Sequence, residues 1–371
     1  MRRLLALQKS SRRVTISLVA PLTRRQMLAG SVPVLGAGAL LHGVIPHSHP
    51  WGHDAQAATG DGEHGGHAGH AADTIHDGHA SFNGGKTVDH RANGFDPSEL
   101  LRDFDPGKTS KLPGGQVLRE WTLIAADKEI EVAPGVMFAA WTYNGRVPGP
   151  TLRCREGERL RITFVNGSEH PHTIHFHGIH PAEMDGVPGI GAGQIDPGQR
   201  TVYEFDAAPA GLHLYHCHVR PLAEHIAKGL YGAFIVDPAD GREDADEMVM
   251  VMNGFDTDFD RENEFYAVNS IPFAHMHEPV QVKRDELVRI YLVNVLEHDL
   301  INSIHIHGNF FHYYPTGTSL EPAEFTDTIM QCQGQRGILE IRFPYTGKYM
   351  FHAHQSEFAQ LGWMGFFEVK D

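Results

Sequence analysis

Four pairs of histidines, each with one residue between its members, are the residues of this chain best suited to chemistry. Residues two apart in a β-strand point to the same face, so such a pair presents two imidazoles side by side and turns the middle residue to the opposite face. Imidazole suits copper, zinc, iron and nickel, so the pairs predict a metal centre without choosing the metal. The four pairs are His175 and His177, His216 and His218, His305 and His307, and His352 and His354.

The residue between the second pair helps to choose the metal. It is Cys217, whereas the fourth pair encloses Ala353. The thiol of Cys217 would face the interior of its own domain, where His172 and His225 are also available. Two histidines and one cysteine form the trigonal blue-copper arrangement, in which a soft thiolate selects copper and tunes its potential. The sequence therefore predicts a copper site on His172, Cys217 and His225.

A blue-copper site often has a weak axial methionine, and at the expected distance after His225 this chain has Leu230 instead. Leucine has no donor atom, so a copper ion here would be three-coordinate, with a raised potential. An ordinary core leucine is an alternative interpretation, and both hold together. The other cysteines, Cys154 and Cys332, make an odd total of three. Any disulfide would therefore leave at least one thiol free.

The elements that must position these residues occur twice along the chain. The stretch ERLRITFVN from Glu158 matches ELVRIYLVN from Glu286, and both alternate as half-buried strands. GLHLYHCH from Gly211 likewise matches GKYMFHAH from Gly347. From residue 117 onward, short alternating runs are separated by glycine and proline turns, which predicts an all-β fold. We therefore expect one β-sandwich over residues 117–240 and a second over residues 241–371.

The motifs of both halves together resemble those of multicopper oxidases of the small, laccase-like class, which is related to copper nitrite reductases. The resemblance rests on NGRVPGPTLR, HTIHFHG, HCH, HIHG and HAH, and it covers nearly all of residues 117–371. It implies two Greek-key cupredoxin β-sandwich domains in tandem and four copper ions. The type 1 copper would bind His172, Cys217 and His225, and the type 2 copper His175 and His305. The type 3 pair would bind His177, His216, His218, His307, His352 and His354.

An activity follows from the same resemblance. A reducing substrate would give up single electrons at the type 1 copper, and a trinuclear cluster would reduce O2 to water. Phenols, aromatic amines and low-valent metal ions are all candidate substrates, and the sequence does not choose among them. The clusters would lie between subunits of a homotrimer. Asp185, in EMDGVPG, resembles the acid that relays protons beside the type 2 copper, although a solvated loop aspartate is the alternative; Glu357 is a weaker candidate.

Two departures from the family pattern matter for the copper sites. The step from Cys217 to His225 is longer than in laccases and nearer to that of nitrite reductases. In the second domain, Asn302 stands at the counterpart of His172, and Ala353 at that of Cys217. No type 1 copper is therefore expected in the second domain.

Two other functions remain as alternatives. A copper-containing nitrite reductase needs only a lone type 2 copper, which would leave His175 and His218 without a role. A non-enzymatic copper-binding protein is suggested by a histidine-rich segment and by Met248, Met250 and Met252. These methionines alternate as one face of a strand, which favours core packing over copper binding.

The N-terminal part of the chain has a different character. Residues 1–57 carry seven lysines and arginines, then an apolar glycine-rich run and a small-residue site, as in a secretory signal. TRRQMLAG resembles a twin-arginine signal, so we expect export, for example to the periplasm; an uncleaved membrane anchor is the alternative. Residues 58–116 are expected to form a histidine-rich disordered segment and linker, which could collect copper.

Charge excludes one class of partner. The formal net charge is −15, and removing the seven basic residues and one aspartate of residues 1–57 changes it to −21. So acidic a protein does not suit nucleic acid, whose phosphates need a basic surface. Once the signal is removed, no membrane association is expected.

Overall fold

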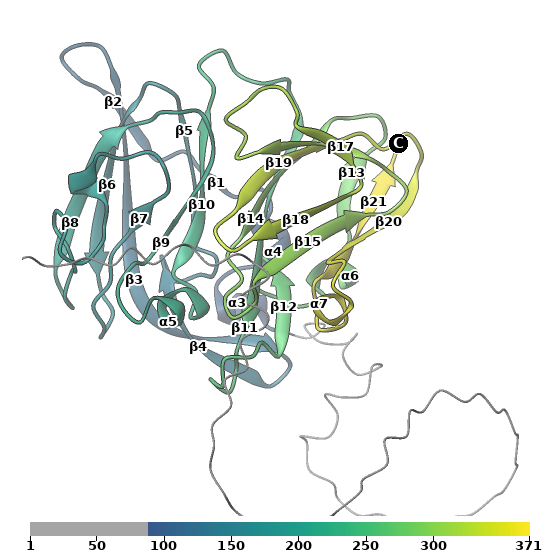
Figure 1. Cartoon of the computed structure of the whole chain (residues 1–371), viewed down its shortest axis with the longest axis horizontal. Coiled ribbons are helices and arrows are strands. Elements are labelled where there is room, and N and C mark those ends of the chain that lie inside the picture. Colours follow the sequence, from purple (N-terminus) through teal and green to yellow (C-terminus); the bar gives the residue numbers. More distant parts are fainter. Residues whose placement is uncertain (1–87) are drawn as a thin grey trace, which may run out of the picture. The chain divides into compact units, whose positions relative to one another are not determined.

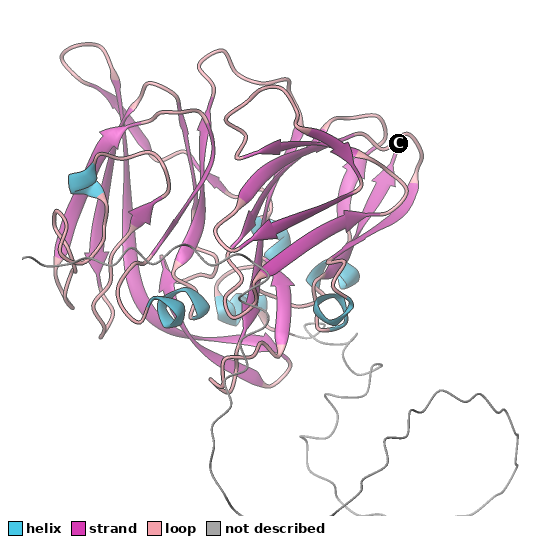
Figure 2. Ribbon diagram, in the orientation of Figure 1, coloured by secondary structure: helices cyan, strands magenta, loops and turns pink. Residues whose placement is uncertain are grey.

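Two β-sandwiches follow one another along the chain, the first from β1 to β10 and the second from β11 to β21 (Figures 1 and 2). The computed structural model describes residues 88–371, so the predicted signal and the histidine-rich residues before 88 lie outside the described residues. The predicted all-β fold of two tandem β-sandwiches is confirmed. Within residues 88–371, no helix is long and apolar enough to cross a lipid bilayer.

The first sandwich consists of two mixed sheets. One sheet has the order β1 (Phe104–Asp105), β5 (Thr151–Arg155), β10 (Tyr231–Asp237), β9 (Gly211–His216) and β7 (His175–Phe176). The other has the order β2 (Lys108–Lys111), β3 (Val117–Ala133), β6 (Arg159–Asn166) and β8 (Arg200–Asp206), with β4 (Val136–Tyr143) also paired to β3. The helix α5 (Leu222–Ala227) lies between β9 and β10 in the chain.

The second sandwich repeats this plan. Its first sheet has the order β12 (Phe265–Val268), β11 (Asp246–Phe255), β14 (Val288–Asn294), β19 (Arg336–Ile341), β16 (Phe311–Pro315) and β17 (Glu324–Thr326). Its second has the order β13 (Val280–Lys283), β21 (Met364–Lys370), β20 (Gly347–His352), β15 (Ile301–Ile306) and β18 (Thr328–Cys332). The helix α7 (Ser356–Gln360) follows β20 as α5 follows β9, and α6 (Ala274–His277) precedes β13.

The two strands expected to be half-buried differ in the structure. In β6, Leu160, Ile162 and Phe164 are buried and alternate with partly exposed residues, as predicted. The prediction is wrong for β14, because all of its residues are buried. Its second face packs against the first sandwich, where Tyr291 and Val293 join one apolar cluster with residues of β9 and β10. A strand covered on both faces loses its alternation.

The expected disordered linker also needs correction over residues 88–116. These residues form α3 (His90–Asn93), α4 (Pro97–Leu100), β1 and β2, and the two strands pair with β5 and β3. Phe95, Leu100 and Leu101 are buried in the cores, which offsets the entropy of ordering the segment. The side-chain amide of Asn93 donates to the carbonyl of Glu131 and accepts from its N–H, both at 2.8 Å. The stretch before residue 88 is outside the described residues.

Candidate metal centres

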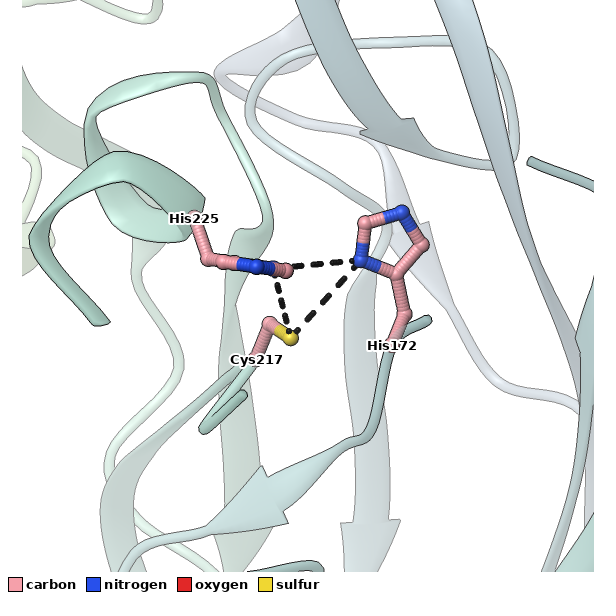
Figure 3. A group of neighbouring side chains, drawn as sticks. All are labelled: His172, Cys217 and His225. Carbon is pink, nitrogen blue, oxygen red and sulfur yellow. Dashed lines mark hydrogen bonds between the residues drawn. The ribbon is translucent and has the colours of Figure 1, made fainter. Parts of the chain in front are cut away.

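Three side chains predicted to form the type 1 site meet in the first domain (Figure 3). Cys217 directly follows β9, His225 lies on α5, and His172 is held in a loop by two backbone hydrogen bonds of 3.1 Å with Ile195. The Cys217 Sγ is 3.2 Å from His225 Nδ1 and 3.9 Å from His172 Nδ1. The two Nδ1 atoms are 3.2 Å apart, and all three side chains are buried.

This geometry fits a single metal ion. A trigonal ion bonded to nitrogen at about 2.0 Å and to sulfur at about 2.3 Å would hold the donors about 3.5 to 3.7 Å apart. Burial lowers the pKa of His172 to about 3 and that of His225 to about 4, so both imidazoles are neutral ligands. Burial raises the pKa of the Cys217 thiol. The Thr173 N–H, which donates to Sγ at 3.4 Å, lowers that pKa by a smaller amount. A coordinated metal deprotonates such a thiol.

Apolar side chains enclose the three ligands. The Trp141 ring lies with its centroid 4.7 Å from that of His225 and 5.2 Å from that of His172. Leu230 is fully buried in the same cluster as Cys217, and its carbonyl accepts from the Cys217 N–H at 3.0 Å. Leu230 is therefore a core leucine, and its role in place of an axial ligand stays a prediction.

The first two histidine pairs form a half-site on neighbouring strands. His175 on β7 lies opposite His216 at the end of β9, and the Nε2 atoms of His177 and His216 are 2.9 Å apart. The ring of His218 is 5.4 Å from that of His175, centroid to centroid. Burial lowers the pKa of His177 to about 2 and that of His216 to about 4, which keeps these imidazoles available to a metal.

The other two pairs form an equivalent half-site in the second domain. His305 on β15 lies opposite His352 at the end of β20, and the Nε2 atoms of His307 and His352 are 3.0 Å apart. The ring of His354 is 5.6 Å from that of His305. In the described part of the chain, no group of neighbouring metal-ligand side chains combines histidines of both domains. Each domain therefore holds four of the eight histidines that are predicted to bind the cluster.

Backbone carbonyls orient the histidines of both half-sites. A ring Nδ1 that faces a carbonyl carries the hydrogen, which leaves Nε2 unprotonated for a metal. Four of the eight rings have this contact, and the two domains share the pattern. The pairs are His175 with Asp185 O (2.8 Å), His216 with Cys217 O (2.7 Å), His305 with Asp327 O (3.0 Å), and His352 with Ala353 O (2.6 Å).

The structure places Asp185 beside the first half-site. Its Oδ1 is 2.9 Å from His175 Nδ1 and 3.5 Å from His180 Nε2. His180 is outside the predicted ligand set, although it is the third histidine within HFHGIH. Glu357 is exposed on α7 and belongs to none of the groups of neighbouring metal-ligand side chains in residues 88–371.

The other two cysteines and the three methionines lie apart from these groups. Cys154 is buried and Cys332 is exposed, and both are free thiols. The three methionines are packed in the apolar core of the second domain, which confirms core packing. They are Met248, Met250 and Met252.

Comparisons with known proteins agree with a chain of two cupredoxin-like domains. Residues 125–241 match one multicopper oxidase family model, and residues 245–371 match a second. A crystal structure of a multicopper oxidase is 67% identical, covers 76% of this chain and 100% of its own, and has a TM-score of 0.76. The copper nitrite reductase of Nitrosomonas europaea is 27% identical, covers 68% of this chain and 94% of its own, and has a TM-score of 0.62.

Nitrite reductases also occur among the sequence relatives. The copper-containing nitrite reductase of Neisseria meningitidis serogroup A is 29% identical over 252 residues, which are 62% of this chain and 63% of that protein. Oxidases and nitrite reductases therefore share this fold of two cupredoxin-like domains, and both are copper oxidoreductases. The two family models together match more than half of the sequence, so the chain belongs to the multicopper oxidase family as a two-domain member.

Proposed function

We propose that the protein is a laccase-like oxidase that couples one-electron oxidation of a small reducing substrate to four-electron reduction of O2 to water. The observation that carries the proposal is the pair of matching half-sites. Each presents two Nε2 atoms about one hydrogen-bond length apart, at 2.9 Å in the first domain and 3.0 Å in the second. A single type 2 copper has no need of eight histidines, whereas one type 2 and two type 3 coppers use all of them.

The residues have separable tasks in this mechanism. His172, Cys217 and His225 would hold the type 1 copper, and the bound coppers would supply the electron transfer and the oxygen chemistry. Cys217 is bonded through the backbone to its neighbours His216 and His218, so one covalent path joins both kinds of site. We assign proton delivery to Asp185, whose Oδ1 lies 2.9 Å from His175 Nδ1 at the edge of the half-site.

We also propose that the complete cluster forms between copies of the chain. The half-sites of one chain belong to separate groups, and His307 and His354 are exposed. A first domain that faces the second domain of a neighbouring copy would bring four and four histidines together. Head-to-tail contacts of this kind close into rings, and a homotrimer with three clusters is the assembly that we propose. Export through a twin-arginine-type signal in residues 1–57 belongs to the same proposal.

A copper nitrite reductase is the second candidate, because relatives of that function align with both domains. The two candidates differ in their need for His175 and His218.

With copper-loaded protein and a one-electron donor, we expect O2 to be consumed. His175→Ala or His218→Ala should abolish this O2 consumption. The exposed His312 provides the matched control, since His312→Ala should leave turnover unchanged. Nitrite turnover that survives both half-site variants would replace our proposal with the reductase, and no turnover of either acceptor would favour a copper-binding protein.

A further inference from the structure

The imidazole of His172 is hydrogen-bonded on the side away from the predicted copper. Its Nδ1 faces Cys217 and His225, whereas its Nε2 lies 3.0 Å from the hydroxyl of Ser168. The same hydroxyl is 2.8 Å from Asp127 Oδ1. His172 and Ser168 are buried, and Asp127 lies at the surface on β3. A chain of hydrogen bonds thus leads from the candidate ligand to a surface carboxylate.

The direction of these hydrogen bonds follows from the groups involved. A carboxylate only accepts, so the single hydroxyl hydrogen of Ser168 is donated to Asp127. The Ser168 oxygen then accepts from its other neighbours, which are His172 Nε2 and the N–H of His170 at 3.1 Å. The hydrogen of the His172 ring therefore lies on Nε2. Its Nδ1 is left with a free lone pair, directed at the other two candidate ligands.

The loop around Ser168 is fixed by its own contacts. The side-chain amide of Asn166 donates to the carbonyls of His170 (2.7 Å) and Ile195 (2.8 Å), and its oxygen accepts from the Ser168 N–H at 3.1 Å. The other carboxylate oxygen of Asp127 accepts from the Glu169 N–H at 2.8 Å. These contacts hold the Ser168 hydroxyl and the Asp127 carboxylate close to one another.

We propose that Ser168 and Asp127 are positioning residues for the type 1 copper. They hold His172 as an Nδ1 ligand, and the anionic end of the chain makes its ring a stronger donor. A histidine whose outer N–H is bonded toward a carboxylate is a more basic ligand, and loss of such a partner typically weakens metal binding about 10- to 100-fold. A stronger donor stabilises Cu(II) over Cu(I), which lowers the potential. This opposes the rise expected from Leu230, which offers no axial donor atom.

The inference rests on the type 1 site of the proposed function and not on its electron acceptor. The test is a redox titration of the visible charge-transfer band of copper-loaded protein, with Ser168→Ala, Ser168→Thr, Asp127→Asn and their combination. Ser168→Ala should weaken Cu(II) relative to Cu(I) about tenfold, the low end of the range for such partners. For a one-electron couple this equals a rise of about 59 mV. Asp127→Asn should raise the potential less, because its charge is screened by solvent.

Three comparisons decide the outcome. Ser168→Thr retains the hydroxyl and should keep the potential of the parent protein. Asp127→Asn should have a smaller effect in the Ser168→Ala background, because only its solvent-screened charge then acts on the ring. Glu169→Gln is the matched control, since it removes the same charge from the residue next to Ser168 and should leave the potential unchanged. The inference is overturned by unchanged potentials in both Ser168→Ala and Asp127→Asn, by an Asp127→Asn effect of equal size without the hydroxyl, or by an equal shift in Glu169→Gln. A parent protein without the visible band would instead refute the type 1 assignment itself.

Discussion

The pocket proposed to hold the type 1 copper in the first domain and its counterpart in the second share a pattern of backbone hydrogen bonds and differ in their side chains. The N–H of Cys217 donates to Leu230 O at 3.0 Å, and the N–H of Ala353 donates to Trp363 O at 3.1 Å. Leu230 N–H in turn donates to His225 O at 3.2 Å, and Trp363 N–H donates to Phe358 O at 2.8 Å. By this pattern, Ala353 stands for Cys217, Phe358 for His225, and Trp363 for Leu230.

In the second pocket, packing has replaced the ligands. Trp363 is fully buried, and its indole N–H donates to Asn302 Oδ1 at 3.0 Å. Asn302 stands for His172, so the second pocket retains none of the three candidate ligands. The outward histidines remain in both domains because they lie on the opposite faces of the same strands. The second domain can therefore lack the three inner candidate ligands and keep its four outward histidines.

The largest effect is expected where the comparison is most direct, at Cys217. Cys217→Ser should abolish both the visible charge-transfer band and substrate turnover, because the thiolate is the ligand that selects copper and begins the covalent path to the cluster. The matched variant in the second domain, Ala353→Ser, should change neither. Absorption spectra and O2 uptake measure both effects, and turnover that persists in Cys217→Ser would refute electron input at this site.

Rebuilding the lost pocket should add one copper ion per chain. The variant Asn302→His, Ala353→Cys and Phe358→His restores the three donors, and Trp363→Leu makes room for them. We expect copper analysis to show one additional equivalent, with a second blue component in the spectrum. The same three changes with Trp363 retained should add none, because the indole fills the pocket. Equal copper content in the two variants would contradict the view that packing closed this site.

Removal of the indole alone should affect stability rather than copper. Trp363→Ala should lower the free energy of unfolding by about 3–5 kcal/mol, the usual cost of deleting a buried aromatic side chain. Denaturant titration measures this loss, with the copper-loaded parent as reference. The visible spectrum of the folded variant should not change, since Trp363 belongs to the pocket without ligands. A shifted spectrum would show that the two pockets are coupled.

The smallest effect is expected from a donor atom added beside the first site. Leu230→Met offers a thioether near the predicted axial position. A bound thioether would lower the potential by tens of millivolts. For a one-electron couple, about 59 mV corresponds to a tenfold change in the equilibrium constant. Trp363→Met is the matched change in the second domain and should leave the potential as it is. A redox titration with no shift in Leu230→Met would place the side chain of residue 230 away from the metal.

Part of this comparison could be predicted from the sequence. The period of two places the paired histidines outward and Cys217 inward, and the internal repeat identifies Asn302 and Ala353 as replacements. The counterpart of His225 could not be found this way. Ala353 lies 136 residues after Cys217, whereas Trp363 lies only 133 after Leu230. The segment from Ala353 to Trp363 is therefore shorter than the corresponding segment of the first domain. Hydrogen bonds, and not a constant offset, identify the matching residue.

Other features depend on contacts between distant segments. The pattern of β14 predicts one exposed face, yet the first sandwich covers it. The order of residues 88–116 depends on strand pairing with β3 and β5, which composition does not reveal. The hydrogen bond between Ser168 and Asp127, which extends the link to His172, joins residues 41 positions apart, one in a loop and one on β3. Such contacts arise from the tertiary fold, so no local sequence pattern predicts them.

In the proposed function, electrons received in the first domain reduce O2 completely at a cluster shared by both kinds of domain. The most direct test counts molecules of a one-electron phenolic donor oxidised per O2 consumed by copper-loaded protein, with hydrogen peroxide assayed in the same reaction. We expect four donor molecules per O2 and no peroxide, because complete reduction of O2 to water takes four electrons. Two donor molecules per O2 with matching peroxide, or donor oxidation that requires nitrite in place of O2, would contradict it.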